Sequence, residues 1–342
     1  MPPDEPIWWY RTEPGFAATA LAPAAALYGW AAKARFSFAN PYRSRLPVFC
    51  VGNFTAGGTG KTPVSGYLCA RLRALGRTPV VLTRGYGGRV SGPHVLQDSD
   101  SAETVGDEAL LHAQTARVVI AKDRAEGARA IEALPDVGAI VMDDGLQNPQ
   151  LNKDLVIAVV DGRRAFGNGR VIPAGPLRAP LTFQLDIADA IIVNQSTAGA
   201  GDLTAAALKD NFTGPVLRCM TVPDGDTAWI KGQRIVAWAG IAAPDRFYSL
   251  LTTLGANIAE RIAFPDHHAL TAADAQKLLQ LAQQQRAILV TTEKDIARLR
   301  GTEGACADLA AASRPLPIKI VFAKQDAERF DALVQGALQS AR

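Results

Sequence analysis

Short apolar runs alternate with helical patterns along most of the chain from residue 46 onward. Six apolar runs rich in β-branched residues predict strands, at residues 48–51, 79–83, 118–121, 139–142, 155–160 and 190–193. Between several of them, spaced apolar positions predict helices, as at residues 63–75 and 123–133. Continuous apolar strands that alternate with helices are typical of a parallel sheet covered on both faces. We therefore expect an α/β fold with ligand-binding residues at the carboxyl ends of the strands.

The pattern changes near residue 227, where two short runs flank Lys231-Gly232 and predict a hairpin turn. Three more strands are predicted beyond it, at residues 235–239, 287–291 and 318–322. The intervening helical patterns include one after Thr271, which with Asp274 resembles a capping box. This part of the chain is expected to form a second, smaller α/β unit.

The N-terminal region has a different pattern, a nearly uncharged run rich in Ala and Leu at residues 16–32. Aromatic residues precede the run and basic residues follow it: Trp8, Trp9, Tyr10, Lys33 and Arg35. Acidic residues at the start argue against a signal peptide, and Pro23 with the short length argues against a spanning helix. Two alternatives remain, an interfacial helix on a membrane surface and a helix packed on the protein's own core.

Composition narrows the class of protein. The 342 residues are 48% hydrophobic and 20% charged, with a net charge of +3, which excludes a disordered chain and a nucleic-acid-coating protein. The four cysteines, Cys50, Cys69, Cys219 and Cys306, form no C-x-x-C pair. The sequence therefore predicts neither a zinc site nor a disulfide framework, and it fits a reducing compartment.

The strongest chemical signal is a glycine-rich turn between the first strand and its helix. The turn contains the residues predicted to bind a nucleotide: Thr55, Ala56, Gly57, Gly58, Thr59, Gly60, Lys61 and Thr62. Glycines let backbone N–H groups converge on phosphate oxygens, and the helix N-terminus adds a positive dipole end. Lys61 can reach the outer phosphates and Thr62 can ligate Mg²⁺. The spacing is that of the variant x-G-G-x-G-K-T loop, in which a lysine often stands where this chain has Ala56.

Two carboxylates, Asp143 and Asp144, follow the apolar run at residues 139–142. A carboxylate at a strand end can hold Mg²⁺ opposite Thr62, and two adjacent carboxylates favour a nearby cation. The sequence therefore predicts a magnesium site formed by Thr62, Asp143 and Asp144, and it does not decide which carboxylate is the direct ligand.

Two further segments carry groups with more than one interpretation. Asp107, in Gly106-Asp107-Glu108, precedes a helical pattern, so it is either a helix cap, which the pattern alone favours, or the base for an attacking hydroxyl group. His267 lies in Asp266-His267-His268, a pattern that fits a histidine paired with a carboxylate better than a metal site. Residues 293–295 either contact a nucleotide base or are plain turn residues.

Three arginines stand among turn residues and form a predicted basic surround: Arg84, Arg124 and Arg178. Guanidinium groups suit phosphate oxygens, so these side chains are predicted to bind an anionic substrate besides the nucleotide.

Eight motifs in this order resemble those of the tetraacyldisaccharide 4′-kinase family, the lipid A 4′-kinases of Gram-negative bacteria. The motifs lie at residues 52–63, 83–87, 106–108, 143–147, 173–178, 239–247, 264–268 and 290–295. The resemblance runs from the N-terminal apolar helix to the final strands, which is nearly the whole chain. One departure is Ala179, where the family usually has an acidic residue.

The resemblance implies ATP- and Mg²⁺-dependent phosphorylation of the 4′-hydroxyl group of a tetraacylated glucosamine disaccharide 1-phosphate. The pattern of the chain itself divides it into a P-loop NTPase-like core at residues 37–222, a hairpin hinge at 223–236 and a smaller α/β domain at 237–342. The resemblance also implies that residues 1–36 form a membrane-associated helix at the cytoplasmic face of the inner membrane. Asp107 becomes the expected catalytic base with His267 as its partner, and Lys61 and Asp144 join them as catalytic residues.

An alternative from another class is a membrane-associated P-loop ATPase that acts as a switch and modifies no small molecule. The glycine-rich loop and the N-terminal helix fit this alternative, whereas Ala56 and the segment with His267 do not. A soluble sugar kinase is a further alternative, although it would have no use for the N-terminal helix. No nucleic-acid partner is expected.

Overall fold

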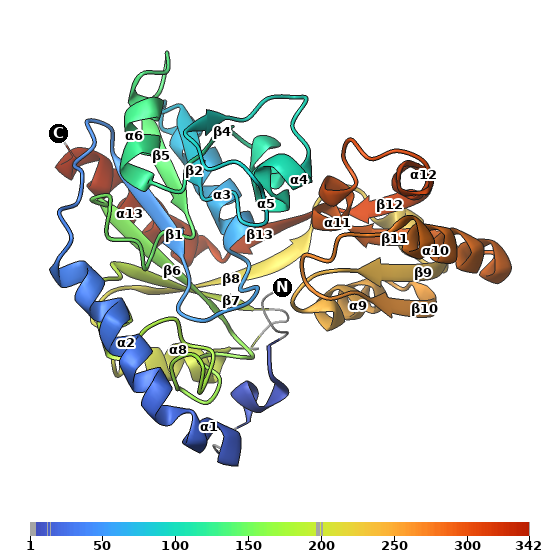
Figure 1. Cartoon of the computed structure of the whole chain (residues 1–342), viewed down its shortest axis with the longest axis horizontal. Helices are drawn as coiled ribbons and strands as arrows, with labels where there is room; N and C mark the ends of the chain where they lie inside the picture. Colours follow the sequence, from blue (N-terminus) through green and yellow to red (C-terminus); the bar gives the residue numbers. More distant parts are fainter. Residues whose placement is uncertain (1–4, 12, 14, 196–198, 200, 342) are drawn as a thin grey trace.

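The computed structural model describes residues 5–11, 13, 15–195, 199 and 201–341. It consists of a large and a small α/β unit that lie side by side (Figure 1). The large unit contains a nine-stranded sheet with the strand order β13-β8-β7-β6-β1-β5-β2-β4-β3. Its strands are β1 Val48–Gly52, β2 Pro79–Thr83, β3 His94–Val95, β4 Arg117–Ile120, β5 Ala139–Asp143, β6 Leu155–Asp161, β7 Ala190–Gln195, β8 Val216–Pro223 and β13 Ile318–Phe322. The two edge strands, β3 and β13, are antiparallel to their neighbours and the other pairs are parallel.

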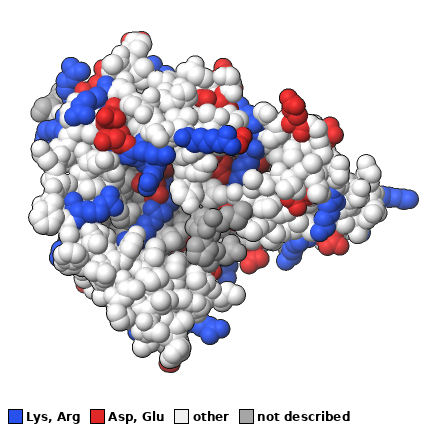
Figure 2. All heavy atoms as spheres, in the orientation of Figure 1, with Lys and Arg blue, Asp and Glu red and all other residues white. Residues whose placement is uncertain are grey.

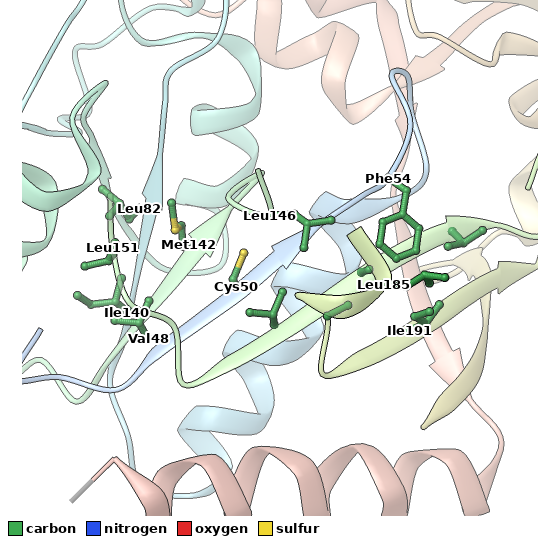
Figure 3. Close-up of a cluster of buried hydrophobic side chains, with 14 of the residues drawn as sticks. Val48, Cys50, Phe54, Leu82, Ile140, Met142, Leu146, Leu151, Leu185 and Ile191 are labelled. Atoms are coloured by element: carbon green, nitrogen blue, oxygen red, sulfur yellow. The ribbon is translucent and has the colours of Figure 1, made fainter. Parts of the chain in front are cut away.

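The alternation of side chains along the central strands builds two cores. Val48 and Cys50 of β1 face one core, and Phe49 and Val51 face the other. Figure 3 shows part of the first core, in which Val48 and Cys50 lie with Ile140 and Met142 of β5. Every residue of β1 is buried, which shows that both faces of the sheet are covered at this strand. The continuous apolar run predicts this burial.

Helices from separate parts of the chain cover the two faces of the large sheet. One face is covered by α3 Lys61–Ala74, α5 Asp107–Ala113 and α13 Lys324–Ser340, and the other by α6 Arg124–Glu132, α7 Leu181–Asp186 and α8 Asp202–Lys209. A short helix, α4 Ala102–Val105, precedes α5. This arrangement confirms the expected α/β fold with a mostly parallel sheet.

The small unit contains a four-stranded parallel sheet with the order β10-β9-β11-β12. Its strands are β9 Arg234–Ala239, β10 Asn257–Ala263, β11 Ile288–Thr292 and β12 Ser313–Leu316. Its helices are α9 Pro244–Thr253, α10 Ala272–Gln285, α11 Glu293–Arg298 and α12 Ala305–Ala312. The predicted capping box is present, since Thr271 and Asp274 bond each other's backbone at the start of α10.

Two predictions about this part of the chain are wrong. Strand β13 does not complete the small sheet, because it pairs with β8, and α13 packs Phe330 and Val334 against the large sheet. An apolar run predicts a strand but does not name its partner. The predicted hairpin at Lys231-Gly232 is also absent, because the helical turn η2 Ala228–Ile230 precedes β9, which pairs in parallel.

The chain therefore passes between the two units twice, from β8 to β9 and from β12 to β13. Two connections restrict their relative position more than the single hinge at residues 223–236 would. The last part of the predicted C-terminal domain, residues 318–341, belongs to the large unit.

The N-terminal segment lies along the large unit as η1 Ile7–Tyr10, α1 Phe16–Ala20 and α2 Ala22–Ser37. The ring of Phe36 packs edge-on against Phe183 of α7, with 5.0 Å between the ring centres. Ala25 and Gly29 face the protein, whereas large apolar side chains such as Phe16 and Trp30 are exposed. Among the described residues, no helix is long and apolar enough to cross a bilayer.

Candidate active site

The glycine-rich turn connects β1 to α3 at the carboxyl edge of the large sheet, and we call residues 53–62 the phosphate loop. Gly57 and Gly60 have positive φ angles of 90° and 91°, which side chains rarely tolerate. A Cβ at Gly60 would stand 2.2 Å from the Asn194 side-chain nitrogen. That nitrogen donates to the Thr59 carbonyl group at 3.0 Å, so β7 fixes the turn from below.

The phosphate loop is also held by the segment 173–178. The Ala56 amide donates to the Pro176 carbonyl group at 2.8 Å, and Thr55 forms an isolated bridge with Leu177. In the described part of the chain, the backbone amides of residues 57–60 donate to no backbone or side-chain group. The loop is thus rigid, and its converging N–H groups are free to bind an anion.

Two basic side chains surround Asp144 beside the loop. Its carboxylate accepts two hydrogen bonds from Arg178 Nη1, both at 2.8 Å, and Lys61 Nζ lies 3.6 Å from Oδ1. Burial would raise the pKa of Asp144, but the charges of Arg178 and Lys61 outweigh burial and hold that pKa well below its ordinary value. The Asp144 side chain is one-third exposed, so this carboxylate is charged and reachable.

Asp143 has a different environment from its neighbour. Its side chain is buried, Ser65 donates to Oδ1 at 3.1 Å, and His112 Nε2 lies 3.2 Å from Oδ2. Burial would raise the pKa of Asp143, but His112 opposes burial and the pKa is lowered. Asp143 is thus enclosed by the protein, whereas Asp144 is partly exposed, so Asp144 with the Thr62 hydroxyl fits a hard cation such as Mg²⁺ better than Asp143 does.

The three predicted substrate arginines take different positions. Arg84 follows β2 and is exposed, so it is free to meet an anion. Arg178 is engaged by Asp144 and by the Thr55 carbonyl group. Arg124 is 3% exposed and donates to the carbonyl groups of Ala121 and Asp143, while burial lowers its pKa to about 10. This placement makes Arg124 a support for the strand ends and argues against its predicted contact with substrate.

Asp107 meets residues of the small unit. It is the first residue of α5 and 4% exposed, and its Oδ1 accepts from the next amide, that of Glu108, at 2.8 Å. Its Oδ2 lies 3.1 Å from His267 Nδ1, which confirms that these two residues pair. The Tyr86 ring lies against His267, with 5.1 Å between ring centres. The sequence favoured a plain helix cap, whereas the structure brings Asp107 into a site between the units.

Further charged groups complete this site, which we call the cross-unit cluster: Asp107, Glu108, Asp266, His267, Lys294 and Arg298. Arg298 Nε donates to Asp107 Oδ2 at 2.7 Å. Lys294 Nζ lies 3.3 Å from a Glu108 oxygen and 3.4 Å from an Asp266 oxygen. Residues 293–295 are therefore more than plain turn residues. Sequence reasoning missed Arg298, for which only the spacing from Asp295 on a short helix could have been a signal.

A second contact joins the two units. Arg246 of α9 pairs with Asp161 at the end of β6, and Asp161 is buried. A Cβ at Gly58 would lie 3.6 Å from the Ala242 Cβ, so the turn before α9 approaches the phosphate loop, where Gly58 itself is exposed. The small unit thus contacts the large one through two arginine–aspartate pairs and also comes close to the phosphate loop.

The N-terminal segment also reaches the phosphate loop. A Cβ at Gly57 would lie only 1.7 Å from Glu5 Oε1, so the Glu5 carboxylate occupies the space that a side chain would need. The other Glu5 oxygen accepts from Tyr10 at 2.7 Å and from Arg164 at 3.0 Å. Burial raises the pKa of Glu5. Sequence reasoning did not connect these distant segments.

The sequence profile of the tetraacyldisaccharide-1-P 4′-kinase family, LpxK, matches residues 17–339. A tetraacyldisaccharide 4′-kinase of Nitrobacter winogradskyi is 43% identical over 327 residues, 95% of each chain. One of Rhodopseudomonas palustris strain BisA53 is 43% identical over 341 residues, 99% of this chain and 97% of the relative.

A solved structure, that of LpxK from Aquifex aeolicus in complex with ATP, is similar in fold. Its TM-score is 0.71 at 24% identity, and the match covers 94% of this chain and 99% of the other. The similarity extends over both units.

Proposed function

The chain belongs to the tetraacyldisaccharide-1-P 4′-kinase family, and we propose that it transfers phosphate from ATP to a lipid A precursor. The acceptor is the 4′-hydroxyl group of a tetraacylated glucosamine disaccharide 1-phosphate. The family supports this activity, and the resemblance seen in the sequence is confirmed. The pairing of Asp107 with His267 is the observation that carries the assignment, since it holds a buried carboxylate and its partner between the small unit and the unit that bears the phosphate loop.

The phosphate loop supports ATP as the donor. Its free amides and the start of α3 would hold the triphosphate, and Lys61 would contact the outer phosphates. Thr62 and Asp144 would hold Mg²⁺ with phosphate oxygens and water, the ligands that Mg²⁺ usually keeps. Bound Mg²⁺ would neutralise charge that develops on the phosphates.

The acceptor hydroxyl group would be oriented by Asp107. This carboxylate would accept the hydroxyl proton as the oxygen attacks phosphorus, and His267 would hold the carboxylate in place. Because the small unit approaches the loop at Gly58, its closure over bound ATP would exclude water and limit wasteful hydrolysis. Arg84, which is exposed after β2, is the arginine best placed to meet the anionic substrate.

The N-terminal segment supports a peripheral location at the cytoplasmic face of the inner membrane. Phe16, Leu27, Trp30 and Phe38 are 91%, 66%, 67% and 86% exposed. Figure 2 shows a largely uncharged surface over α1 and α2, at the lower left of the view. An interfacial helix has such apolar and aromatic groups with basic flanks, here Lys33 and Arg35.

Mass spectrometry of the lipid tests the activity. We expect one added phosphate on a tetraacylated disaccharide 1-phosphate after incubation with the protein and Mg-ATP, in proportion to the ATP consumed. ATP hydrolysis at the same rate without a lipid acceptor, and no phosphorylated lipid, would instead favour an ATPase switch.

Sedimentation with vesicles that contain anionic lipid tests the membrane contact. Trp30→Glu should weaken vesicle binding, because it places a charge on the exposed apolar surface of α2. Gln280→Glu adds the same charge on an exposed position of α10 and serves as the control. Equal binding of the two variants would contradict the interfacial role.

A further inference from the structure

One arginine of the small unit, Arg298, lies at the centre of the contact with Asp107. The 2.7 Å bond from its Nε is shorter than the 3.1 Å between His267 Nδ1 and the same Asp107 oxygen. The side chains of Arg298 and Asp107 are 8% and 4% exposed. Solvent therefore screens this ion pair much less than a surface pair.

The small unit fixes the Arg298 guanidinium group from the other side. Nη1 donates to the Gly240 carbonyl group and to Asp295 Oδ1, the latter at 2.8 Å, and Nη2 lies 3.5 Å from Asp266 Oδ1. Within the described residues, Asp107 is the one group of the large unit that this guanidinium contacts by a hydrogen bond. Its own unit thus orients the planar fork so that Nε points to the predicted base.

We propose that Arg298 is a positioning residue for phosphoryl transfer, which fixes the direction of the Asp107 carboxylate when the small unit is docked on the large one. A planar guanidinium group donates hydrogen bonds in fixed directions, whereas the ammonium group of a lysine rotates and does not. The docking of the small unit and the orientation of the Asp107 carboxylate therefore both depend on the Arg298 side chain. This inference rests on the proposed kinase function, in which Asp107 meets the acceptor hydroxyl group.

The charges around Asp107 explain why the orientation of its carboxylate matters for phosphoryl transfer. The groups in contact with it are the Glu108 amide on its own helix, His267 before α10, and Lys294 and Arg298 on α11. Further groups contact these partners: Tyr86 lies against His267, and Asp266 and Asp295 lie against Arg298. Burial would raise the pKa of Asp107, but the hydrogen bond from His267 and the charges of Lys294 and Arg298 outweigh burial. They hold the pKa well below its ordinary value.

A carboxylate with so low a pKa is a weak base. Phosphoryl transfer leaves little covalent chemistry to the protein and depends chiefly on positioning and charge. The contribution of Asp107 then rests on aligning the acceptor hydroxyl group, for which a direction imposed by Arg298 matters more than proton affinity. Loss of the guanidinium group would leave the Asp107 carboxylate free to rotate and would also raise the pKa of Asp107.

Arg298→Gln removes both the charge and the planar guanidinium group, whereas Arg298→Lys keeps the charge and removes only the planar group. Both variants are tested by steady-state lipid phosphorylation with the full chain and Mg-ATP. We expect Arg298→Gln to lower kcat about 10²-fold, the scale of a misplaced reacting group, with little change in the KM for ATP. Arg298→Lys should also lose most of kcat with little change in the KM for ATP, because a lysine does not restore the direction of the hydrogen bond.

Arg300→Gln is the matched control. Arg300 stands two positions further along and also reaches the large unit, where it donates to the Asp98 carbonyl group at 2.7 Å. This pair is exposed, and among the described residues neither member forms a hydrogen bond or ion pair with Asp107. The kcat of Arg300→Gln and its KM for ATP should remain those of the wild-type protein. A loss in Arg300→Gln equal to that in Arg298→Gln would overturn the inference in favour of general docking of the units.

Two other results would overturn the inference alone: an unchanged kcat in Arg298→Gln, or full kcat in Arg298→Lys. If thermal unfolding shows that the glutamine variant is not folded, the lysine variant decides, because it keeps the charge and removes the fork. Absence of phosphorylated lipid with the wild-type protein would overturn the proposed function, and this inference with it.

Discussion

The phosphate loop and the cross-unit cluster are built on opposite principles. The loop is one continuous segment whose shape follows from glycines at positive φ, braced by Asn194 and by the segment 173–178. The cluster consists of residues from three segments, at 107–108, 266–267 and 294–298. Its hydrogen bonds form only where these segments meet. A site formed by neighbours in sequence keeps its geometry when the two units move relative to each other. A site formed by contact between the units changes its geometry with that motion.

The two regions also treat charge differently. The loop offers free N–H groups and the Lys61 ammonium to an anion that arrives from outside. In the cluster, cations and carboxylates already neutralise one another, so Asp107 is held charged before any substrate binds. If this contrast is correct, changes in the cluster should act on the acceptor step, and changes in the loop should act on the nucleotide.

The largest effect is expected at Asp107. Asp107→Asn should lower turnover about 10²–10⁴-fold, the scale of a general base, with little change in the affinity for ATP. The variant keeps the size of the side chain but loses the proton acceptor and the charge that attracts Arg298 and Lys294. Steady-state lipid phosphorylation and nucleotide titration measure the two quantities.

Asp123→Asn is the control for Asp107, because Asp123 is a true helix cap that accepts from two amides at the start of α6. Asn caps a helix about as well as Asp does, so this variant should leave both stability and turnover nearly unchanged. If Asp107→Asn behaved in the same way, the helix-cap interpretation that the sequence favoured would be correct and Asp107 would leave the mechanism.

A smaller loss is expected at Lys61, in the phosphate loop. Lys61→Ala should lower turnover about 10²–10³-fold, since one preorganised charge at the transferred phosphate is removed, and it should also weaken ATP binding. Lys319→Ala, which removes an exposed lysine paired with Asp224, should change neither quantity. Undiminished ATP affinity and turnover in Lys61→Ala would place the nucleotide elsewhere.

The same contrast explains what could be predicted from the sequence. The phosphate loop and the buried strands could be predicted because their signals are local: glycine spacing, an apolar run and the first turn of a helix. Asp143 and Asp144 were placed correctly at the end of β5. Their adjacency in the sequence does not show that Ser65 and His112 enclose Asp143 while Asp144 faces Lys61.

Pairings between distant segments could not be predicted in this way. The apolar pattern of β13 fits either sheet, and only the pairing with β8 and the packing of α13 decide between them. Arg298 looks like any helix-terminal arginine, and Arg124 looked like a substrate contact until its buried carbonyl partners were known. The family resemblance linked Asp107 to His267, but periodicity and spacing did not.

The smallest expected effect concerns Glu5, which lies against the phosphate loop although it is far from it in sequence. A carboxylate beside Gly57 opposes an incoming polyphosphate, so Glu5→Gln should tighten nucleotide binding by about two- to fivefold, the range of a single partly exposed charge pair. Quenching of the fluorescence of Trp8 and Trp9 during nucleotide titration gives the affinity. Glu303→Gln removes an exposed carboxylate elsewhere and should have no effect. Weaker binding in Glu5→Gln would mean that the carboxylate braces the loop through Tyr10 and Arg164, and the phosphate loop would then depend on distant segments as much as the cluster does.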